Sequence, residues 1–144
     1  MIADGPELAT LRIALALNLP AEFDFTTMRP VTRTEALKIV VEVTVRRDSP
    51  RIECAIQVDN TVKDHRLRVL MPTGISAPTF LTDAAFDIVE RPVALPADYA
   101  KRRELAVETQ PQQSWAAYGD ALGGLAVVSR GQPEVAVIDR ADRP

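Results

Sequence analysis

Three runs of strictly alternating residues restrict what this chain can fold into. Residues 11–19, 37–45 and 52–58 each carry an apolar side chain at every second position, and β-branched residues dominate the second run. A period of two is that of a β-strand with one buried face, so each run is predicted to be a strand. Pro20 ends the first run. The short polar turn 47–50 separates the other two runs, which predicts an antiparallel hairpin.

Shorter strand candidates and frequent turn residues fill the rest of the chain. The predicted elements after residue 60 are a strand with Leu67, Val69 and Met71 on its inward face, a loop 72–83, a strand 85–91, a long excursion 93–113 with a short helix around 99–107, a short strand 114–118, a hairpin of 125–129 with 134–138, and a charged tail 139–144. Many strands with turns between them and little helix predict an all-β fold, an antiparallel β-sandwich. At 144 residues the chain is predicted to be a single domain, 1–144.

The charge balance and the hydropathy pattern argue against several classes of function. The 17 basic and 20 acidic side chains leave a net charge of −3, which gives no reason to expect nucleic acid as a partner. No apolar run approaches the roughly 20 residues that span a bilayer, so no membrane association is expected. The first residues lack a basic segment followed by an apolar stretch. No signal peptide is therefore predicted, and a cytoplasmic location is expected.

The chain has one cysteine, Cys54, and one histidine, His65. A single cysteine excludes an internal disulfide, and one Cys with one His cannot form a zinc site of the Cys/His type. No Asp-rich loop with calcium spacing is present, so no metal site is predicted in this chain. Cys54 falls at an alternating position of a predicted strand, which favours a buried and unreactive thiol.

Charge gathers in the stretch 59–74, DNTVKDHRLRVLMPTG, which contains the only histidine. A Ser-His-acid triad is one catalytic arrangement that such a stretch could serve. None of the serines lies in a G-x-S-x-G motif. Asp64 and His65 are adjacent, and adjacent side chains on a strand point to opposite faces. The sequence therefore argues against a triad.

Three nearby carboxylates, Asp83, Asp87 and Glu90, are candidates for the paired acids of a glycosidase. On one strand, however, Asp87 and Glu90 would lie on opposite sides. A polar outer face with hydrogen-bonding carboxylates at strand ends is the simpler interpretation. No catalytic residue is assigned in this chain.

Sequence segments in a fixed order resemble one known family. They are SPRIECAIQVDN (49–60), KDHRLRVLMPTGI (63–75), AFDIVERPV (85–93) and GGLAVVSRGQPEV (123–135). With a glutamine-containing strand before the last segment, this order is similar to the C-terminal β-domain of glycoside hydrolase family 38, the α-mannosidases. The residues that match the family pattern are Asp59, Asn60, Asp64, His65, Arg66, Leu67, Arg68, Pro72, Thr73, Gly74, Phe86, Asp87, Glu90, Arg91, Pro92, Gly124, Leu125, Ala126, Gly131, Pro133 and Glu134.

The sequence departs from the family pattern at several positions. Ser129 stands where the family often has asparagine, and Val135 where it often has tyrosine. The segment 116–123 differs from the more acidic turn of the family. Family β-domains also continue beyond the point that matches residue 144, so the chain is expected to be an early part of that domain.

The resemblance implies a part of a galactose-mutarotase-like supersandwich that serves as an accessory and scaffold domain. In the family, the parent enzyme is a retaining α-mannosidase that hydrolyses α-mannosides, with roles in mannose and glycan metabolism and in carbohydrate binding. Its zinc ion and aspartate nucleophile belong to an N-terminal catalytic domain, which is the partner that the resemblance implies. No cofactor is therefore expected in this chain, and the chain alone is expected to lack hydrolase activity.

The resemblance also implies a polar cluster that is either structural or at the rim of the parent's active site. Its members are Asp64, His65, Arg66, Arg68, Asp87, Glu90 and Arg91. Two other interpretations stay open. A stand-alone carbohydrate-binding module would use aromatic platforms, of which Trp115 is the leading candidate, although its alternating run also suits a core position. A structural interaction domain would expose apolar sheet surface and self-associate.

Overall fold

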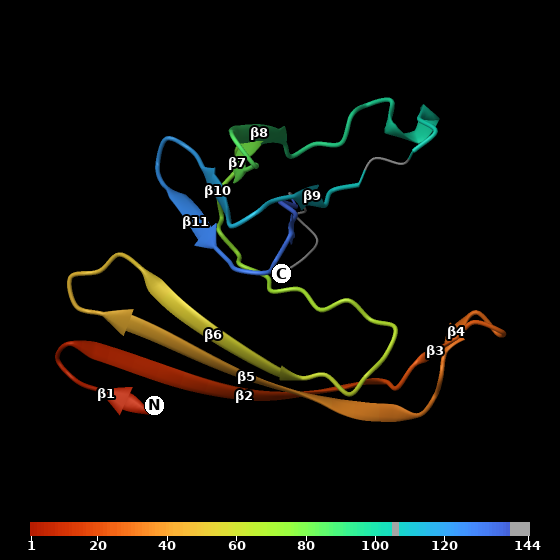
Figure 1. Cartoon of the computed structure of the whole chain (residues 1–144), viewed down its shortest axis with the longest axis horizontal. Helices are drawn as coiled ribbons and strands as arrows, with labels where there is room; N and C mark the ends of the chain where they lie inside the picture. Colours follow the sequence, from red (N-terminus) through yellow and green to blue (C-terminus); the bar gives the residue numbers. More distant parts are fainter. Residues whose placement is uncertain (105–106, 139–144) are drawn as a thin grey trace. The chain divides into compact units, whose positions relative to one another are not determined.

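The computed structural model describes residues 1–104 and 107–138 of the chain (Figure 1). The chain divides into two compact units, Met1–Arg68 (unit 1) and Val69–Pro144 (unit 2). Nearly all regular structure is antiparallel β-sheet, and the helix within the described ranges is one short 3-10 turn. The prediction of an all-β antiparallel fold with little helix is therefore confirmed. That the two units fold together as a single domain, 1–144, stays a prediction.

Unit 1 is built on a four-stranded sheet with the order β1-β2-β5-β6, and β3 pairs separately with β4. The strands are β1 (Ala3–Asp4), β2 (Leu8–Pro20), β3 (Phe23–Asp24), β4 (Arg29–Pro30), β5 (Thr34–Arg46) and β6 (Ile52–Asp59). The long β2, β5 and β6 lie next to one another in Figure 1. The three alternating runs of the sequence are thus strands, and the predicted β5–β6 hairpin is confirmed.

The register places the alternating apolar residues of β2, β5 and β6 on one face of the sheet. Leu17 lies opposite Leu37, and Ile39 lies opposite Val58. Directly opposed residues share a face, so the apolar positions of the three strands form one continuous surface. One end of this surface is covered, because Leu37 and Ile39 are buried together with Val62 in the small core of unit 1.

The rest of the apolar face is exposed, and this overturns the prediction for Cys54. Large apolar side chains on it are 36–65% exposed, namely Leu11, Ile13, Leu15, Leu17, Val45, Ile52, Ile56 and Val58. Cys54 is exposed as well. The prediction of a buried thiol is wrong because alternation fixes which face a side chain joins, and does not fix whether that face is covered. β6 is also the last strand of its sheet in the described part of the chain.

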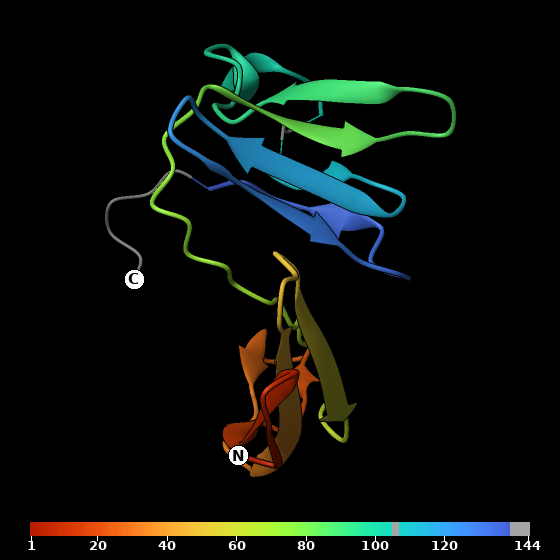
Figure 2. The same cartoon turned by 90° about the vertical axis from the view of Figure 1, so that its left-hand side faces the viewer.

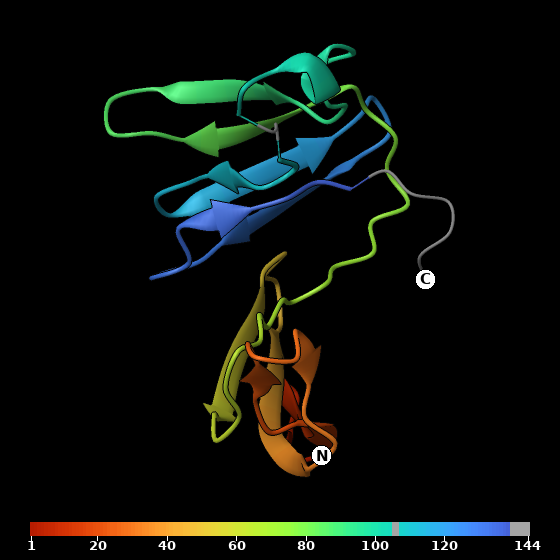
Figure 3. The ribbon, with the colours of Figure 1, turned by 90° about the vertical axis from the view of Figure 1, so that its right-hand side faces the viewer.

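Unit 2 contains a second four-stranded sheet with the order β11-β10-β7-β8 and a small sheet of β9 and β12. The elements are β7 (Thr79–Asp83), β8 (Ile88–Pro92), the 3-10 turn η1 (Tyr99–Lys101), β9 (Gln110–Pro111), β10 (Trp115–Gly119), β11 (Gly124–Val128) and β12 (Glu134–Val135). Figure 2 shows the green β7–β8 hairpin beside the blue β10–β11 hairpin. Figure 3 gives the opposite view of the same sheet. Phe80 and Ala116 are its buried apolar residues.

The β10–β11 hairpin is closed by two glycines that oppose each other, Gly119 and Gly124. A Cβ atom on Gly124 would lie 3.2 Å from the carbonyl oxygen of Tyr118 and 3.3 Å from Cα of Gly119. Contacts of this length with backbone atoms leave little room for any larger residue. The pair of glycines therefore allows the close approach of the two strands.

The strand predicted around Leu67, Val69 and Met71 is absent, and this prediction is wrong. The chain has no strand or helix from residue 60 to 78, and these three side chains are 43–58% exposed. Asp64 has a φ of 55°, which interrupts an extended strand near its start. The segment instead connects unit 1 to unit 2, and the boundary along the chain falls between Arg68 and Val69.

Predictions in the second half of the chain need further corrections. The predicted loop 72–83 contains β7, which the sequence did not reveal because only five residues of it are paired. The strand predicted at 85–91 begins later, as β8. The predicted hairpin of 125–129 with 134–138 is wrong, because β11 pairs with β10 and β12 pairs with β9.

The remaining predictions concern helix and tail. The predicted helix around 99–107 is limited to η1 among the described residues, and residues 105–106 lie outside them. The charged tail 139–144 also lies outside the described residues. Within the described ranges, no helix is both long enough and apolar enough to cross a membrane.

Candidate functional site

The densest polar site of unit 2 is centred on the carboxylate of Asp83, at the end of β7. Its two oxygens accept hydrogen bonds from the backbone N–H groups of Gln113 (2.8 Å), Ser114 (2.9 and 3.0 Å) and Trp115 (3.2 Å). The Ser114 hydroxyl donates a further bond of 2.5 Å. One side chain thus anchors the segment that leads into β10 to the end of β7, where the two strands pair.

These hydrogen bonds change the ionisation of Asp83. Desolvation by itself raises the pKa of the carboxyl, but the bonds from Ser114, Gln113 and Trp115 outweigh it and hold the pKa well below its ordinary value. Asp83 is therefore a carboxylate at neutral pH. A general acid must carry a proton at the working pH, so Asp83 is unsuited to that role.

A second polar group joins β8 to its neighbours through Arg91. The guanidinium donates from Nε to Oγ1 of Thr82 (2.8 Å) and from Nη1 to Oε1 of Gln110 (3.2 Å). Thr82 is fully buried in β7, whereas Arg91 is half-buried. The bonds connect β8 to β7 and to β9. Arg91 therefore stabilises the sheet of unit 2.

The two predicted carboxylates of this region also make local bonds. Glu90 accepts a hydrogen bond from the Thr79 hydroxyl across the β7–β8 pair (2.6 Å). Asp87 accepts one from the backbone N–H of Ile88 (2.7 Å) in the turn before β8. Both carboxylates are exposed. They belong to one hairpin, but each interacts with a different neighbour.

The predicted polar-cluster residues of the stretch 59–74 are Asp64, His65, Arg66 and Arg68, and they lie at the end of unit 1. Asp64 accepts a hydrogen bond from the backbone N–H of Phe23 (3.0 Å) and fastens this stretch to β3. Nδ1 of His65 lies 3.4 Å from the carbonyl oxygen of Lys63. His65, Arg66 and Arg68 are exposed. Asp64 thus has a structural role, and a rim role for the group stays a prediction.

Trp115, the predicted sugar platform, is half-buried in β10 and its backbone N–H bonds to Asp83. Tyr118 lies in the same strand. Its hydroxyl accepts a hydrogen bond from the N–H of Ala77 (2.9 Å) and donates one to the carbonyl oxygen of Ala77 (3.2 Å). Tyr118 therefore ties β10 to the segment before β7. Tyr99, in η1, is 42% exposed.

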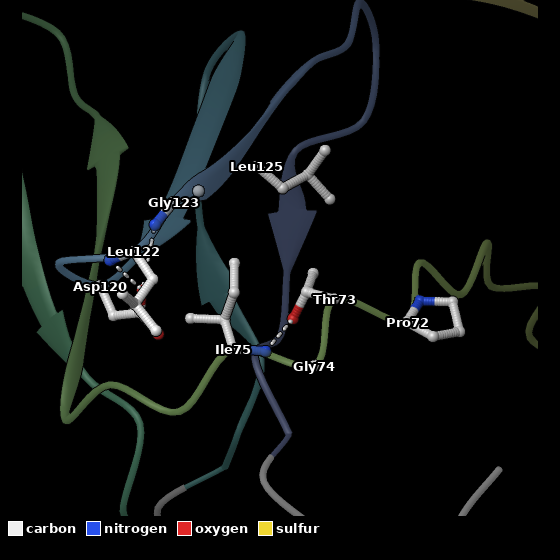
Figure 4. A pocket seen from close by; sticks show the side chains of 9 residues that line it. Pro72, Thr73, Gly74, Ile75, Asp120, Leu122, Gly123 and Leu125 are labelled. Atoms are coloured by element: carbon white, nitrogen blue, oxygen red, sulfur yellow. Dashed lines mark hydrogen bonds between the residues drawn. The ribbon is translucent and has the colours of Figure 1, made fainter.

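An open groove of about 470 Å³ lies within unit 2 (Figure 4). It is lined by Pro72, Thr73, Gly74, Ile75, Asp120, Leu122, Gly123, Gly124 and Leu125. The Thr73 hydroxyl accepts the N–H of Ile75 (3.2 Å), and Asp120 accepts the N–H groups of Leu122 (2.8 Å) and Gly123 (3.1 Å). The hydroxyl of Thr73 and the carboxylate of Asp120 thus shape their own turns. The groove brings together two segments that carry the family resemblance, Pro72–Gly74 and Gly124–Leu125.

Gln112 is a polar side chain that the sequence did not single out. It is 9% exposed, and its Nε2 donates to the Ser129 hydroxyl (3.1 Å) and to the carbonyl oxygen of Gln132 (2.8 Å). These bonds link the β9 region to the segment between β11 and β12. Its Oε1 has no hydrogen-bond partner among the described residues. Nothing in the local sequence pattern distinguishes Gln112 from the exposed Gln113 beside it.

The residues present do not fit a zinc site. Among the described residues, no three His, Cys, Asp or Glu side chains lie close enough together to hold a metal ion. Zinc bound by protein takes three or four such ligands. The zinc that the resemblance implies therefore has no ligand set in the described part of this chain.

Comparison with known proteins places the chain in a family. The family model for the Glycosyl hydrolases family 38 C-terminal domain matches residues 19–143. The chain belongs to this family. The resemblance predicted from the sequence segments is thereby confirmed. Both units contribute to the matched range, and it includes Asp83, Arg91 and the lining of the groove.

Solved structures agree with the family 38 fold. A glycosyl hydrolase family 38 protein and an alpha-mannosidase, both from Enterococcus faecalis, each match 92% of this chain with a TM-score of 0.77 and 24% identity. A protein of Halalkalibacterium halodurans, proposed to be a mannosylglycerate hydrolase, is 33% identical over 64 residues, which is 44% of this chain. The chain spans 16% of the two Enterococcus chains and 7% of the Halalkalibacterium protein.

Proposed function

We propose that this chain serves as an accessory β-domain of a family 38 enzyme that hydrolyses α-mannosides. The observation that carries the proposal is the family match over residues 19–143, which is a match to a C-terminal domain. The partner of such a domain is the catalytic region of the same enzyme. The chain contributes a scaffold, and the catalytic region contributes the nucleophile and the zinc ion.

The chemistry of the described side chains supports an accessory role. Asp83 uses both carboxylate oxygens to hold backbone N–H groups and stays ionised at neutral pH. Glu90 and Asp87 are exposed and interact with different neighbours within one hairpin. A glycosidase needs two carboxyl groups facing one bond, about 5 to 10 Å apart, with one of them protonated. Asp83 and Glu90 join strands of unit 2, and Asp87 bonds within the turn before β8.

The placement of Trp115 and Tyr118 supports a scaffold over a stand-alone carbohydrate-binding module. Trp115 is half-buried in β10, and the hydroxyl of Tyr118 is held by Ala77. A sugar platform needs an open aromatic face. Carbohydrate binding by this chain alone is therefore ranked second as a function. Substitution of Trp115 tests it.

An activity assay tests the proposal from one side. The purified chain, with and without added Zn²⁺, is expected to show no turnover of 4-nitrophenyl α-mannoside. Turnover above a buffer blank that survives further purification would contradict the proposal.

A glycan-binding assay with the wild type, Trp115→Ala and the exposed control Tyr99→Ala is expected to show no binding. Binding that only Trp115→Ala abolishes, with the fold intact, would favour the carbohydrate-binding module.

The coding sequence on both sides of this segment tests the proposal from the other side. The expected result is a family 38 catalytic region in the same reading frame or an adjacent one. Co-expression of that region with and without this chain should then show hydrolysis of the α-mannoside, or a soluble catalytic region, only when the chain is present. Full activity and solubility without the chain would argue against an accessory role.

A further inference from the structure

We propose that the outer edge of β6 is a self-association site, at which two copies of this chain pair antiparallel around a two-fold axis. β6 is the last strand of the sheet order β1-β2-β5-β6, and all eight of its residues are exposed. An edge strand presents unpaired N–H and C=O groups that can bond to another strand. The occupant proposed for this edge is the same strand of a second copy.

The sequence of β6 is self-complementary in one register. When two copies run antiparallel with Ala55 on the two-fold axis, Ile52 lies opposite Val58 and Cys54 lies opposite Ile56. These four side chains belong to the apolar face of unit 1, so the pairing joins apolar residues to apolar residues. Cross-strand pairs of this kind are the unit that stabilises a sheet.

The same register also pairs opposite charges at both ends of the interface. Arg51, just before β6, lies opposite Asp59 of the second copy, and the two-fold axis repeats this pair. Both side chains are exposed. Glu53 lies opposite the neutral Gln57. Opposite charges across a strand pair are stabilising, whereas like charges are destabilising.

Other registers of β6 lose these features. A shift by one residue places apolar side chains opposite polar ones. A shift by two residues in one direction places Glu53 opposite Asp59, which is a like-charge pair. A shift by two in the other direction moves Asp59 past the end of the strand, opposite Ser49. Charge and hydropathy therefore select the register centred on Ala55.

The other long edge of the sheet provides an internal comparison. β1 covers β2 only at Ala9 and Thr10, so the outer edge of β2 also has no strand along most of its length in the described part of the chain. On the face opposite to the apolar one, the exposed residues of β2 from position 12 to 18 are Arg12, Ala14, Ala16 and Asn18, and none of them is acidic. No opposite charges select a register there. Pairing is therefore expected at β6 and not at β2.

Sedimentation velocity of the 144-residue chain over a range of concentrations tests whether it associates. The expected result is a reversible dimer. Arg51→Glu is expected to weaken the dimer about tenfold, because each single substitution removes both symmetric charge pairs. The double variant Arg51→Glu/Asp59→Arg should restore the affinity, since it exchanges the charges. The control Arg29→Glu, a charge reversal in β4, should leave the affinity unchanged.

Cysteine cross-linking then tests the register. In a Cys54→Ser background, Ala55→Cys places two thiols directly opposite each other on the axis, within the Cα separation of a disulfide. Mild oxidation is expected to give a covalent dimer for Ala55→Cys and none for the β2 control Ala14→Cys. A monomer at all concentrations would overturn the proposal and leave β6 to another segment or protein. A dimer whose affinity is unchanged by Arg51→Glu alone, or one that is cross-linked through Ala14→Cys, would overturn it equally.

Discussion

Strands β2 and β5 of unit 1 pair along 13 residues each, whereas no strand in the four-stranded sheet of unit 2 exceeds five residues. Long strands are held mainly by their backbone ladder. Unit 1 accordingly has a small core and few buried side-chain hydrogen bonds among its described residues. The short strands of unit 2 are connected by side chains, above all Asp83, Arg91 and Tyr118. The same all-β class thus uses two different means of stabilisation.

The difference suggests how each unit responds to substitution. In unit 1, a substitution on the apolar face of the sheet is expected to lower stability mainly at the covered end, because apolar side chains elsewhere on that face are already exposed. In unit 2, single polar groups matter because each one joins segments that are distant in the sequence. Trp115 is the only tryptophan, so its fluorescence reports on unit 2. Hydrogen exchange of peptides from residues 8–59 reports on unit 1.

The largest effect is expected for Leu37→Ala, which removes the fully buried side chain of the unit 1 core. Loss of a buried leucine costs about 2–5 kcal/mol of unfolding free energy. Chemical denaturation followed by hydrogen exchange should show this loss in unit 1. Leu17→Ala is the matched control, because Leu17 lies opposite Leu37 in the register and is 40% exposed. Equal losses of unfolding free energy from the two variants would contradict the assignment of Leu37, and not Leu17, to the buried core.

The next effect is expected for Asp83→Asn and appears as a change in pH dependence. The pKa of the Asp83 carboxyl is held below its ordinary value in the folded state, so the charged form stabilises unit 2 at neutral pH. This contribution should fall as the pH drops below about 4, the ordinary pKa of an aspartate, and vanish below the folded pKa. Denaturation monitored by Trp115 fluorescence between pH 7 and pH 3 measures it.

Asp83→Asn should be less stable than the wild type at pH 7, and the difference should shrink toward pH 3. Asp87→Asn is the control, since Asp87 accepts a single backbone bond in its turn. A constant difference between Asp83→Asn and the wild type across this range would mean that the carboxylate charge is not what holds Ser114.

The smallest effect is expected for Tyr118→Phe, which removes the hydroxyl that binds both the N–H and the C=O of Ala77. Loss of such neutral hydrogen bonds costs about 1 kcal/mol. Thermal unfolding of unit 2 should therefore shift slightly downward, with unit 1 unchanged. Tyr99→Phe provides the control, because Tyr99 is 42% exposed in η1. A downward shift in the unfolding temperature of unit 1 instead would contradict the claim that the Tyr118 hydroxyl stabilises unit 2 alone.

The sequence was most informative about unit 1 for a physical reason. Its long strands show many repeats of the period of two, so their positions and the β5–β6 hairpin could be predicted, although β2 and β5 extend beyond the predicted runs. β7 has only five residues, too few to show a period, whereas β10 was predicted as a strand without its partners. The pairing of β7 with β10 depends on Asp83 meeting Ser114, which lies 31 positions away. The pairing of β11 with β10 was missed because Gly123-Gly124 and Gly131-Gln132-Pro133 are both turn signals, and the hairpin was assigned to the second of them.

The candidate site was predicted only in part. Asp64, Arg91 and Glu90 make interactions with a structural role, but the sequence did not reveal their partners, Phe23, Thr82 and Thr79. Asp83 was identified only as one of three carboxylates. Its importance comes from the four hydrogen-bond donors of residues 113–115 that bind its carboxylate. Only the folded chain brings these donors to Asp83, so the sequence could not show them. Burial of Gln112 likewise depends on the approach of the segment around Gln132.

The connection between the units has a practical meaning for how this polypeptide can be divided. Residues 60–78 contain no strand or helix, and Arg68, at the boundary, is exposed. Trypsin cleaves after arginine in accessible extended chain, so a brief digestion should nick the protein there. The two halves, 1–68 and 69–144, could then be separated or kept as a nicked complex. This junction therefore offers a place at which the polypeptide can be divided within the region that matches the family model.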